Sequence, residues 1–235
     1  MKLEVLVDAD AVARMAAAFI ANDARAGVAA RGRFAMAVSG GRTPWAMLRM
    51  LAEHDVPWEG MQIFQVDERV APAGDPERNL THLCESLIER APIAPAQLHP
   101  MPVDAPDLDV AATRYAATLR AIAGSPPVLD LVHLGLGLDG HTASLVPGDP
   151  VLDVTDVDVG LTEIYQGRRR MTLTYPLLNR ARRVLWVVTG EEKADTLAQL
   201  CAGDRTIPGG RIQRENAVVL ADRAAAQGVI SPLAT

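Results

Sequence analysis

The 235-residue sequence predicts a single α/β domain, with a mostly parallel, doubly wound (Rossmann-like) sheet and helices on both faces. Short runs rich in aliphatic and β-branched residues alternate with longer runs rich in Ala and Leu that have helical periodicity. Proline-rich stretches at 91–106 and 125–127 could be read as a linker, but no long low-complexity spacer divides the chain. We therefore expect one domain over residues 1–235.

Strands are predicted where short apolar runs stand between turn signals, and helices where the apolar spacing is helical. Asp8 or Asp10 can cap a helix that runs to about residue 30, and Pro44 suits the first turn of a helix over 44–53. The predicted strands are 3–7, 34–38, 62–66, 129–134, 171–174, 184–188 and 217–220, and the remaining predicted helices are 76–90, 108–123 and 191–200.

The composition excludes several classes of protein. The net charge of −6 and the pI near 5.4 argue against general binding to nucleic acid or to a membrane surface. No uninterrupted apolar run approaches the ~20 residues of a membrane span, and acidic residues near the start do not resemble a signal peptide, so we expect a cytoplasmic protein. The two cysteines, Cys84 and Cys201, predict neither a disulfide framework nor a zinc site.

Ligands of open α/β sheets bind beyond the carboxyl ends of the strands, and three segments at predicted strand ends carry unusual chemistry. The first reads Ser-Gly-Gly-Arg-Thr-Pro. Gly40 and Gly41 let the backbone approach a ligand closely, and the start of a helix offers unpaired N–H groups to an anion. Arg42 and Thr43 could add side-chain donors. A plain tight turn is the alternative, as is a nucleophile elbow centred on Ser39.

The second segment follows the predicted strand 62–66 directly and contains Asp67 and Arg69. Charged side chains at a strand end are expected at a binding site, but they also occur where a strand simply emerges into solvent. Asn79, further along, could hydrogen-bond sugar hydroxyls or could only stabilise the turn before its helix.

The third segment, Gly-Leu-Gly-Leu-Asp-Gly-His-Thr over 135–142, matches the dinucleotide fingerprint Gly-x-Gly-x-x-Gly. That fingerprint also needs a following helix and an acidic residue ~20 positions further on, and Asp139 would place negative charge at the pyrophosphate. We therefore expect no nucleotide cofactor. Asp139 and His141 instead indicate acid–base chemistry, because histidine exchanges a proton near neutral pH and a carboxylate can orient its ring. A structural loop histidine is the alternative.

Together these segments resemble the 6-phosphogluconolactonase family, which is related to the glucosamine-6-phosphate deaminases. In the deaminases, Asp-Gly-His is followed by Ile-Ala-Phe-Asn-Glu, whereas here Val146 occupies the position of that glutamate. The resemblance therefore implies hydrolysis and not removal of an amine. The matching segments run in the family's order and are 39–44, 67–69, 135–148 (GLGLDGHTASLVPG), 170–174 (RMTLT) and 187–193 (VVTGEEK).

The resemblance implies hydrolysis of 6-phospho-D-glucono-1,5-lactone to 6-phosphogluconate, in the oxidative branch of the pentose phosphate pathway, without a metal or another cofactor. His141 would be the general base that activates water, and Asp139 would orient it. The expected partner is this phosphorylated sugar lactone, with no nucleic acid and no membrane, and the chain is expected to be a monomer or a weak homodimer. The residues expected to bind the substrate are Ser39, Gly40, Gly41, Arg42, Thr43, Asp67, Arg69, Asn79, Arg168, Arg170 and Lys193.

Two departures from the family pattern leave alternatives open. The family usually has Asp-Ser-Asn where this chain has Glu77-Arg78-Asn79, so only Asn79 carries over. The stretch before Thr172 is usually richer in proline, so Arg168 is an alternative to Arg170 as the phosphate partner. Covalent catalysis by Ser39 and a sugar-phosphate-binding regulator without turnover are the competing functional hypotheses.

Overall fold

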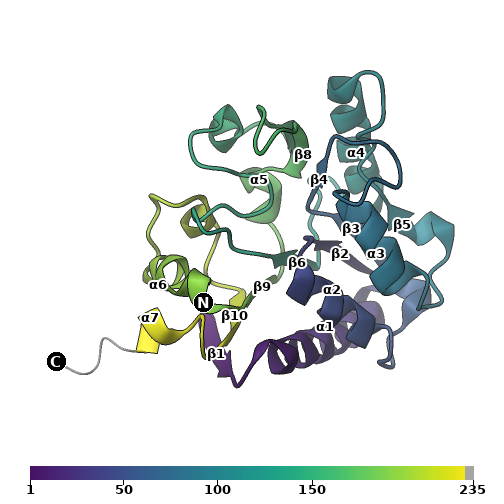
Figure 1. The fold of residues 1–235 in the computed structure, drawn as a ribbon. Coiled ribbons are helices and arrows are strands. Elements are labelled where there is room, and N and C mark those ends of the chain that lie inside the picture. The colour runs from purple at the N-terminus through teal and green to yellow at the C-terminus, as the bar shows by residue number, and fades with distance from the viewer. Residues whose placement is uncertain (231–235) are drawn as a thin grey trace.

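The computed structural model describes residues 1–230, which are built around a seven-stranded parallel sheet (Figure 1). The strand order is β1-β10-β9-β6-β2-β3-β5, and every neighbouring pair is parallel. This confirms the prediction of a mostly parallel sheet. The strands are β1 (Lys2–Leu6), β2 (Phe34–Val38), β3 (Met61–Gln65), β5 (Leu98–His99), β6 (Leu131–Leu134), β9 (Val184–Val188) and β10 (Ala217–Asp222).

Helices cover both faces of this sheet, as predicted. Successive side chains of a strand point to opposite faces, and in β2 all five residues are buried. Phe34 and Met36 belong to a core cluster shared with α1 (Ala9–Arg31) and α2 (Arg42–Leu51). The intervening residues of β2 belong to a second cluster, which includes buried side chains of α4 (Leu108–Ala123), α5 (Tyr175–Leu178) and α6 (Ala194–Ala202).

A second, three-stranded sheet corrects the prediction for two segments. It has the order β4-β8-β7, is antiparallel, and consists of β4 (Asp67–Arg69), β8 (Arg170–Leu173) and β7 (Val159–Leu161). The segment 67–69, expected as a loop, is therefore a strand, and the predicted strand 171–174 lies outside the parallel sheet. Local composition reveals a strand but not its pairing partner, which here is about a hundred residues away.

The helix boundaries follow the capping signals. The Asp8 side chain accepts a hydrogen bond from the N–H of Ala11 (2.8 Å), and Gly32 ends α1 in the left-handed conformation at φ 72°. The predicted helix 76–90 is divided into α3 (Asn79–Leu83) and a π-helical turn (Cys84–Ile88). The predicted helix 191–200 begins as a 3-10 turn (Glu191–Lys193) that leads into α6, and α7 (Gln227–Ile230) follows near the end of the described chain.

None of the helices within residues 1–230 combines the length and the apolar character that crossing a bilayer would require.

Candidate functional site

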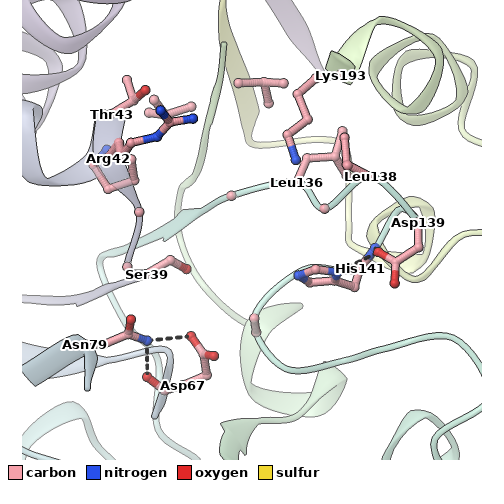
Figure 2. Close-up of a pocket in the computed structure, with 18 of the residues that line it drawn as sticks. Ser39, Arg42, Thr43, Asp67, Asn79, Leu136, Leu138, Asp139, His141 and Lys193 are labelled. Atoms are coloured by element: carbon pink, nitrogen blue, oxygen red, sulfur yellow. Dashed lines mark hydrogen bonds and ion pairs between the residues drawn. The ribbon is translucent and has the colours of Figure 1, made fainter. Parts of the chain in front are cut away.

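A cavity of about 610 Å³ opens beyond the carboxyl ends of β2, β6 and β9, the position where open α/β sheets bind ligands. The strand-end segments predicted from the sequence meet there, although they are far apart along the chain. Figure 2 shows Arg42 and Thr43 on one side of the cavity and His141 on the opposite side. The predicted site residues that line it are Ser39, Gly40, Gly41, Arg42, Thr43, Asp67, Arg69, Asn79, Asp139, His141, Arg170 and Lys193.

Asp139 and His141 form a hydrogen-bonded pair at the edge of the cavity. The Nδ1 atom of His141 lies 2.5 Å from Oδ1 of Asp139, which also accepts the backbone N–H of His141 at 3.1 Å. Burial acts to raise the pKa of Asp139, but the two contacts from His141 and one from the Tyr165 hydroxyl outweigh it and hold the pKa below its usual value. Asp139 is therefore ionised, and Nδ1 of His141 is the nitrogen that carries the proton.

Glycine at position 137 makes this pairing possible. A Cβ atom there would lie 2.1 Å from Nδ1 of His141 and 2.7 Å from Oδ1 of Asp139, so any side chain would displace the pair. The backbone closes the loop, because the N–H of Gly137 donates to the carbonyl of His141 (2.7 Å). A loop of five consecutive residues therefore brings Asp139 and His141 together.

The opposite side of the cavity is the N-terminus of α2. No side chain caps this helix end, and Arg42 and Thr43 occupy its first turn beside the cavity. Free N–H groups and the helix dipole make such an end favourable for an anion. Gly40 allows Asn79 to approach, because a Cβ at residue 40 would lie 1.9 Å from Oδ1 of Asn79. The hydroxyl of Thr43 is paired with that of Thr189 at 2.7 Å.

Ser39 is tied to the sheet beneath the cavity. Its hydroxyl donates to the carbonyl of His133 (3.1 Å), and its N–H donates to Nδ1 of His133 (3.3 Å). Burial lowers the pKa of His133 to about 3, so this imidazole is neutral and can accept the hydrogen bond. Among the hydrogen bonds of residues 1–230, none joins Ser39 to His141.

A buried carboxylate organises the Arg69 and Asn79 region. Glu68 is fully buried, and its Oε1 accepts the backbone N–H groups of Arg69 and Asn79, both at 2.8 Å. Its Oε2 accepts the N–H of Leu80 (2.8 Å) and the side-chain amide of Gln65 (2.8 Å). The Arg69 guanidinium then donates to Oδ1 of Asn79, so the two predicted ligand-binding side chains support each other.

Asp67 connects this region to the loop of the Asp139–His141 pair. The buried Asp67 carboxylate accepts a hydrogen bond from the hydroxyl of Ser144 (2.6 Å), and Nδ2 of Asn79 donates to the Asp67 carbonyl (3.0 Å; Figure 2). Ala143, beside Ser144, adopts φ 53°, a conformation uncommon for a residue with a side chain. The two edges of the cavity are thus held together by a buried polar contact.

Two further cations lie at the cavity. Arg170 is 5 % exposed, and its Nε has no hydrogen-bond partner among the described residues. Burial lowers the pKa of Arg170 while the Asp67 carboxylate raises it, and a guanidinium remains charged at neutral pH. Burial likewise lowers the pKa of Lys193, against the raising influence of Glu192 and Asp139. Figure 2 shows the Lys193 ammonium reaching down into the cavity.

Arg168 is the predicted site residue that the structure places elsewhere. Its guanidinium forms ion pairs with Asp75 (3.2 Å) and with Glu77, and it is absent from the lining of the cavity. Residues two apart in a strand point to the same side, so Arg168 and Arg170 could have shared one face of β8. The tight turn before β8 instead directs Arg168 towards the two carboxylates.

Three residues at the site, Tyr165, Glu68 and Ser144, were not predicted from the sequence. Glu68 and Ser144 stand within segments that carry the family resemblance, so their place in those segments could have indicated them. Tyr165 lies in a stretch that departs from the family pattern, and no signal in the sequence indicated it. Within residues 1–230, no group of three His, Cys, Asp or Glu side chains is arranged to hold a metal ion.

Comparison with known proteins identifies the family. A sequence model described as "Glucosamine-6-phosphate isomerases/6-phosphogluconolactonase" matches residues 7–220. The 6-phosphogluconolactonase of Synechocystis sp. is 35 % identical over 207 residues, covering 86 % of this chain and 85 % of that protein. The one from Mycobacterium bovis is 35 % identical over 238 residues, covering 95 % of this chain and 96 % of that protein.

A solved structure agrees with the sequence relatives. The crystal structure of 6-phosphogluconolactonase from Thermotoga maritima matches with a TM-score of 0.84 at 26 % identity, and the match covers 94 % of this chain and 98 % of that chain. The cavity also lies between the segments that carry the sequence resemblance. The chain therefore belongs to the glucosamine-6-phosphate isomerase/6-phosphogluconolactonase family.

Proposed function

We propose that this protein is a 6-phosphogluconolactonase that hydrolyses 6-phospho-D-glucono-1,5-lactone to 6-phosphogluconate. One observation carries the proposal: the Asp139–His141 pair shares a single cavity with the cationic side chains of Arg69, Arg170 and Lys193 and with the free N-terminus of α2. The pair supplies a base, and these cations and the helix N-terminus supply a place for the phosphate. The Synechocystis and Mycobacterium relatives carry the name of this activity.

In the proposed mechanism, Asp139 holds the proton on Nδ1 of His141, which leaves the lone pair of Nε2 free. Nε2 takes a proton from water as the water oxygen attacks the lactone carbonyl carbon. The tetrahedral oxyanion then collapses, the bond from that carbon to the ring oxygen breaks, and the imidazolium returns the proton to the ring oxygen. General base catalysis of this kind contributes ~10²–10⁴-fold.

The phosphate supplies binding energy and positioning in this proposal, because it is remote from the reacting carbon. Arg170 supports this assignment, since it is a buried cation with an unpaired N–H beside the cavity. Arg69, Lys193 and the start of α2 complete the proposed anion-binding rim. Arg168 is left out of it, because its guanidinium is occupied by Asp75 and Glu77.

Two alternatives receive less support. The hydroxyl of Ser39 donates to the His133 carbonyl, whereas a nucleophile would donate to its base, so direct attack by water is favoured over an acyl-enzyme. The position of the deaminase glutamate is held by Val146, which is 4 % exposed and carries no carboxylate. Hydrolysis is therefore favoured over deamination.

The experiment is a pH-stat assay of acid release from freshly prepared 6-phosphogluconolactone, corrected for spontaneous ring opening. We expect the protein to accelerate acid release and to liberate no ammonia from glucosamine 6-phosphate. Acid release at the spontaneous rate would refute the proposal, and binding of 6-phosphogluconate without turnover would identify a regulator. Ser39→Ala should retain substantial turnover, and near-complete loss with intact binding would indicate the acyl-enzyme route instead.

A further inference from the structure

Tyr165 stands on a short hairpin that reaches the cavity from the second sheet. Its N–H donates to the carbonyl of Arg168 (3.0 Å), and the N–H of Arg168 donates back to the carbonyl of Tyr165 (3.3 Å). The two residues between them, Gln166 and Gly167, have φ 51° and φ 81°. Positive φ at both central residues defines the tight two-residue turn that matches the twist of its flanking strands. We call residues 165–168 the Tyr165 turn.

The Tyr165 turn is anchored on two sides. Arg168 pairs with Asp75 and with Glu77, which belong to the loop before α3. At the base of the turn, the N–H of Thr162 donates to the carbonyl of Arg170 (2.9 Å), and the Thr162 hydroxyl accepts the N–H of Arg170 (3.0 Å). These contacts hold the turn in place, which gives Arg168 a supporting role at some distance from the cavity.

Tyr165 contacts both members of the Asp139–His141 pair. Its hydroxyl donates to Oδ2 of Asp139 (3.1 Å), and its ring lies edge-on to the His141 ring with centroids 5.7 Å apart. The Arg170 guanidinium lies 4.9 Å from the centre of the same ring, an arrangement that favours a cation. The charged and titratable groups that face Tyr165 are therefore Asp139, His141 and Arg170, and Lys193 acts on this cluster through Asp139.

The two oxygens of Asp139 thus have separate partners, with Oδ1 bound to His141 and Oδ2 bound to Tyr165. A carboxylate held at both oxygens cannot rotate away from the histidine. Burial first, and then the neighbouring Asp139 charge, raise the pKa of Tyr165, so its hydroxyl remains a proton donor throughout the neutral range.

We propose that Tyr165 is a positioning residue, whose hydroxyl fixes the Asp139 carboxylate so that His141 presents Nε2 to the cavity. This inference rests on the proposed function, because it assigns a role within the same catalytic pair.

The test is Tyr165→Phe, which removes only the hydroxyl and keeps the ring. Losing one hydrogen bond of about 1 kcal/mol should lower kcat about fivefold, with KM changed less than twofold. The acidic limb of the pH profile of kcat/KM should move to lower pH, because an Asp139 carboxylate that can rotate away from His141 stabilises its protonated form less. Tyr165→Leu, which also removes the ring, should lower kcat further.

Tyr115→Phe is the matched control, because its hydroxyl contacts Gln65 and the carbonyl of His99 and touches neither Asp139 nor His141. It should lower the melting temperature and leave the pH profile in place. A Tyr165→Phe enzyme with the wild-type kcat and the wild-type profile would overturn the proposal. So would an equal shift of the profile in Tyr115→Phe.

A spectroscopic measurement makes the inference independent of turnover. Correlation of ¹⁵N and ¹H signals reports the tautomer of each of the five histidines, and His141→Gln assigns the relevant signal. We expect the Nδ1-protonated tautomer of His141 in the wild type and a mixture in Tyr165→Phe. Identical spectra would overturn the role of Tyr165. Failure of the wild type to hydrolyse the lactone would refute only the proposed function.

Discussion

The two edges of the cavity are built in different ways. The Asp139–His141 edge is a loop of five residues, closed by its own backbone and allowed by the absence of a side chain at Gly137. The anion-binding rim is assembled from distant segments, and the buried Glu68 holds part of it in position. Substitutions in the five-residue loop should change activity without disturbing the fold. Substitutions that disturb the rim should weaken both ligand binding and thermal stability.

The largest expected effect is on the Asp139–His141 edge of the cavity. His141→Ala removes the proposed base, so kcat should fall by ~10²–10⁴-fold. The affinity for 6-phosphogluconate, measured by calorimetry, should stay within about twofold, and the melting temperature should change little because the His141 side chain is partly exposed. Lactone hydrolysis at the wild-type rate would exclude His141 as the base.

The second largest effect is expected at the anion-binding rim. Arg170→Met should raise KM ~10- to 100-fold, because charge-assisted hydrogen bonds contribute ~1.5–3 kcal/mol. Arg168→Met is the matched comparison, and we expect it to raise KM less than about threefold because Arg168 is occupied by Asp75 and Glu77. Steady-state kinetics on both variants tests the assignment. A larger KM effect at residue 168 would reverse it.

Glu68→Gln tests whether the rim links binding to stability. An amide NH₂ group would face N–H donors where Oε2 now accepts hydrogen bonds from Gln65 and Leu80. Leaving such buried groups unsatisfied costs ~2 kcal/mol, which lowers the melting temperature by ~4–8 °C in a domain of this size. KM should rise severalfold because the side chain at residue 68, which also accepts the N–H groups of Arg69 and Asn79, must shift to relieve this contact between donors. Wild-type thermal stability, measured by calorimetry, would contradict this role.

The difference between a local loop and an assembly of distant segments also explains which parts of the fold and of the site could be predicted from the sequence. The alternation of strand and helix patterns predicted the parallel sheet, and Asp139 and His141 were found because they lie two residues apart. The Tyr165 hydroxyl reaches Asp139 from 26 positions away, and Ser144 contacts Asp67 across 77. Such contacts depend on how β4 and β8 pair, and strand pairing is set by tertiary packing that local patterns do not record.

The smallest expected effect concerns Lys193. Because burial lowers the pKa of its ammonium group, Lys193 loses charge at lower pH than an exposed lysine does. Its attraction for an anion should therefore weaken as pH rises towards the alkaline range. The ligand keeps its charge there, since its phosphate and carboxylate are fully ionised above neutral pH.

The measurement is the Kd of 6-phosphogluconate at pH 7.0 and pH 9.5, because the product is not consumed by alkaline ring opening. A partly exposed ion pair contributes less than ~1 kcal/mol, so we expect Kd to rise by up to about fivefold. Lys193→Arg retains its charge across this range and should flatten the pH dependence. If Kd rises equally with pH in Lys193→Arg, the effect belongs to another group. If Kd in Lys193→Arg does not change with pH, Lys193 is among the residues that bind the anion.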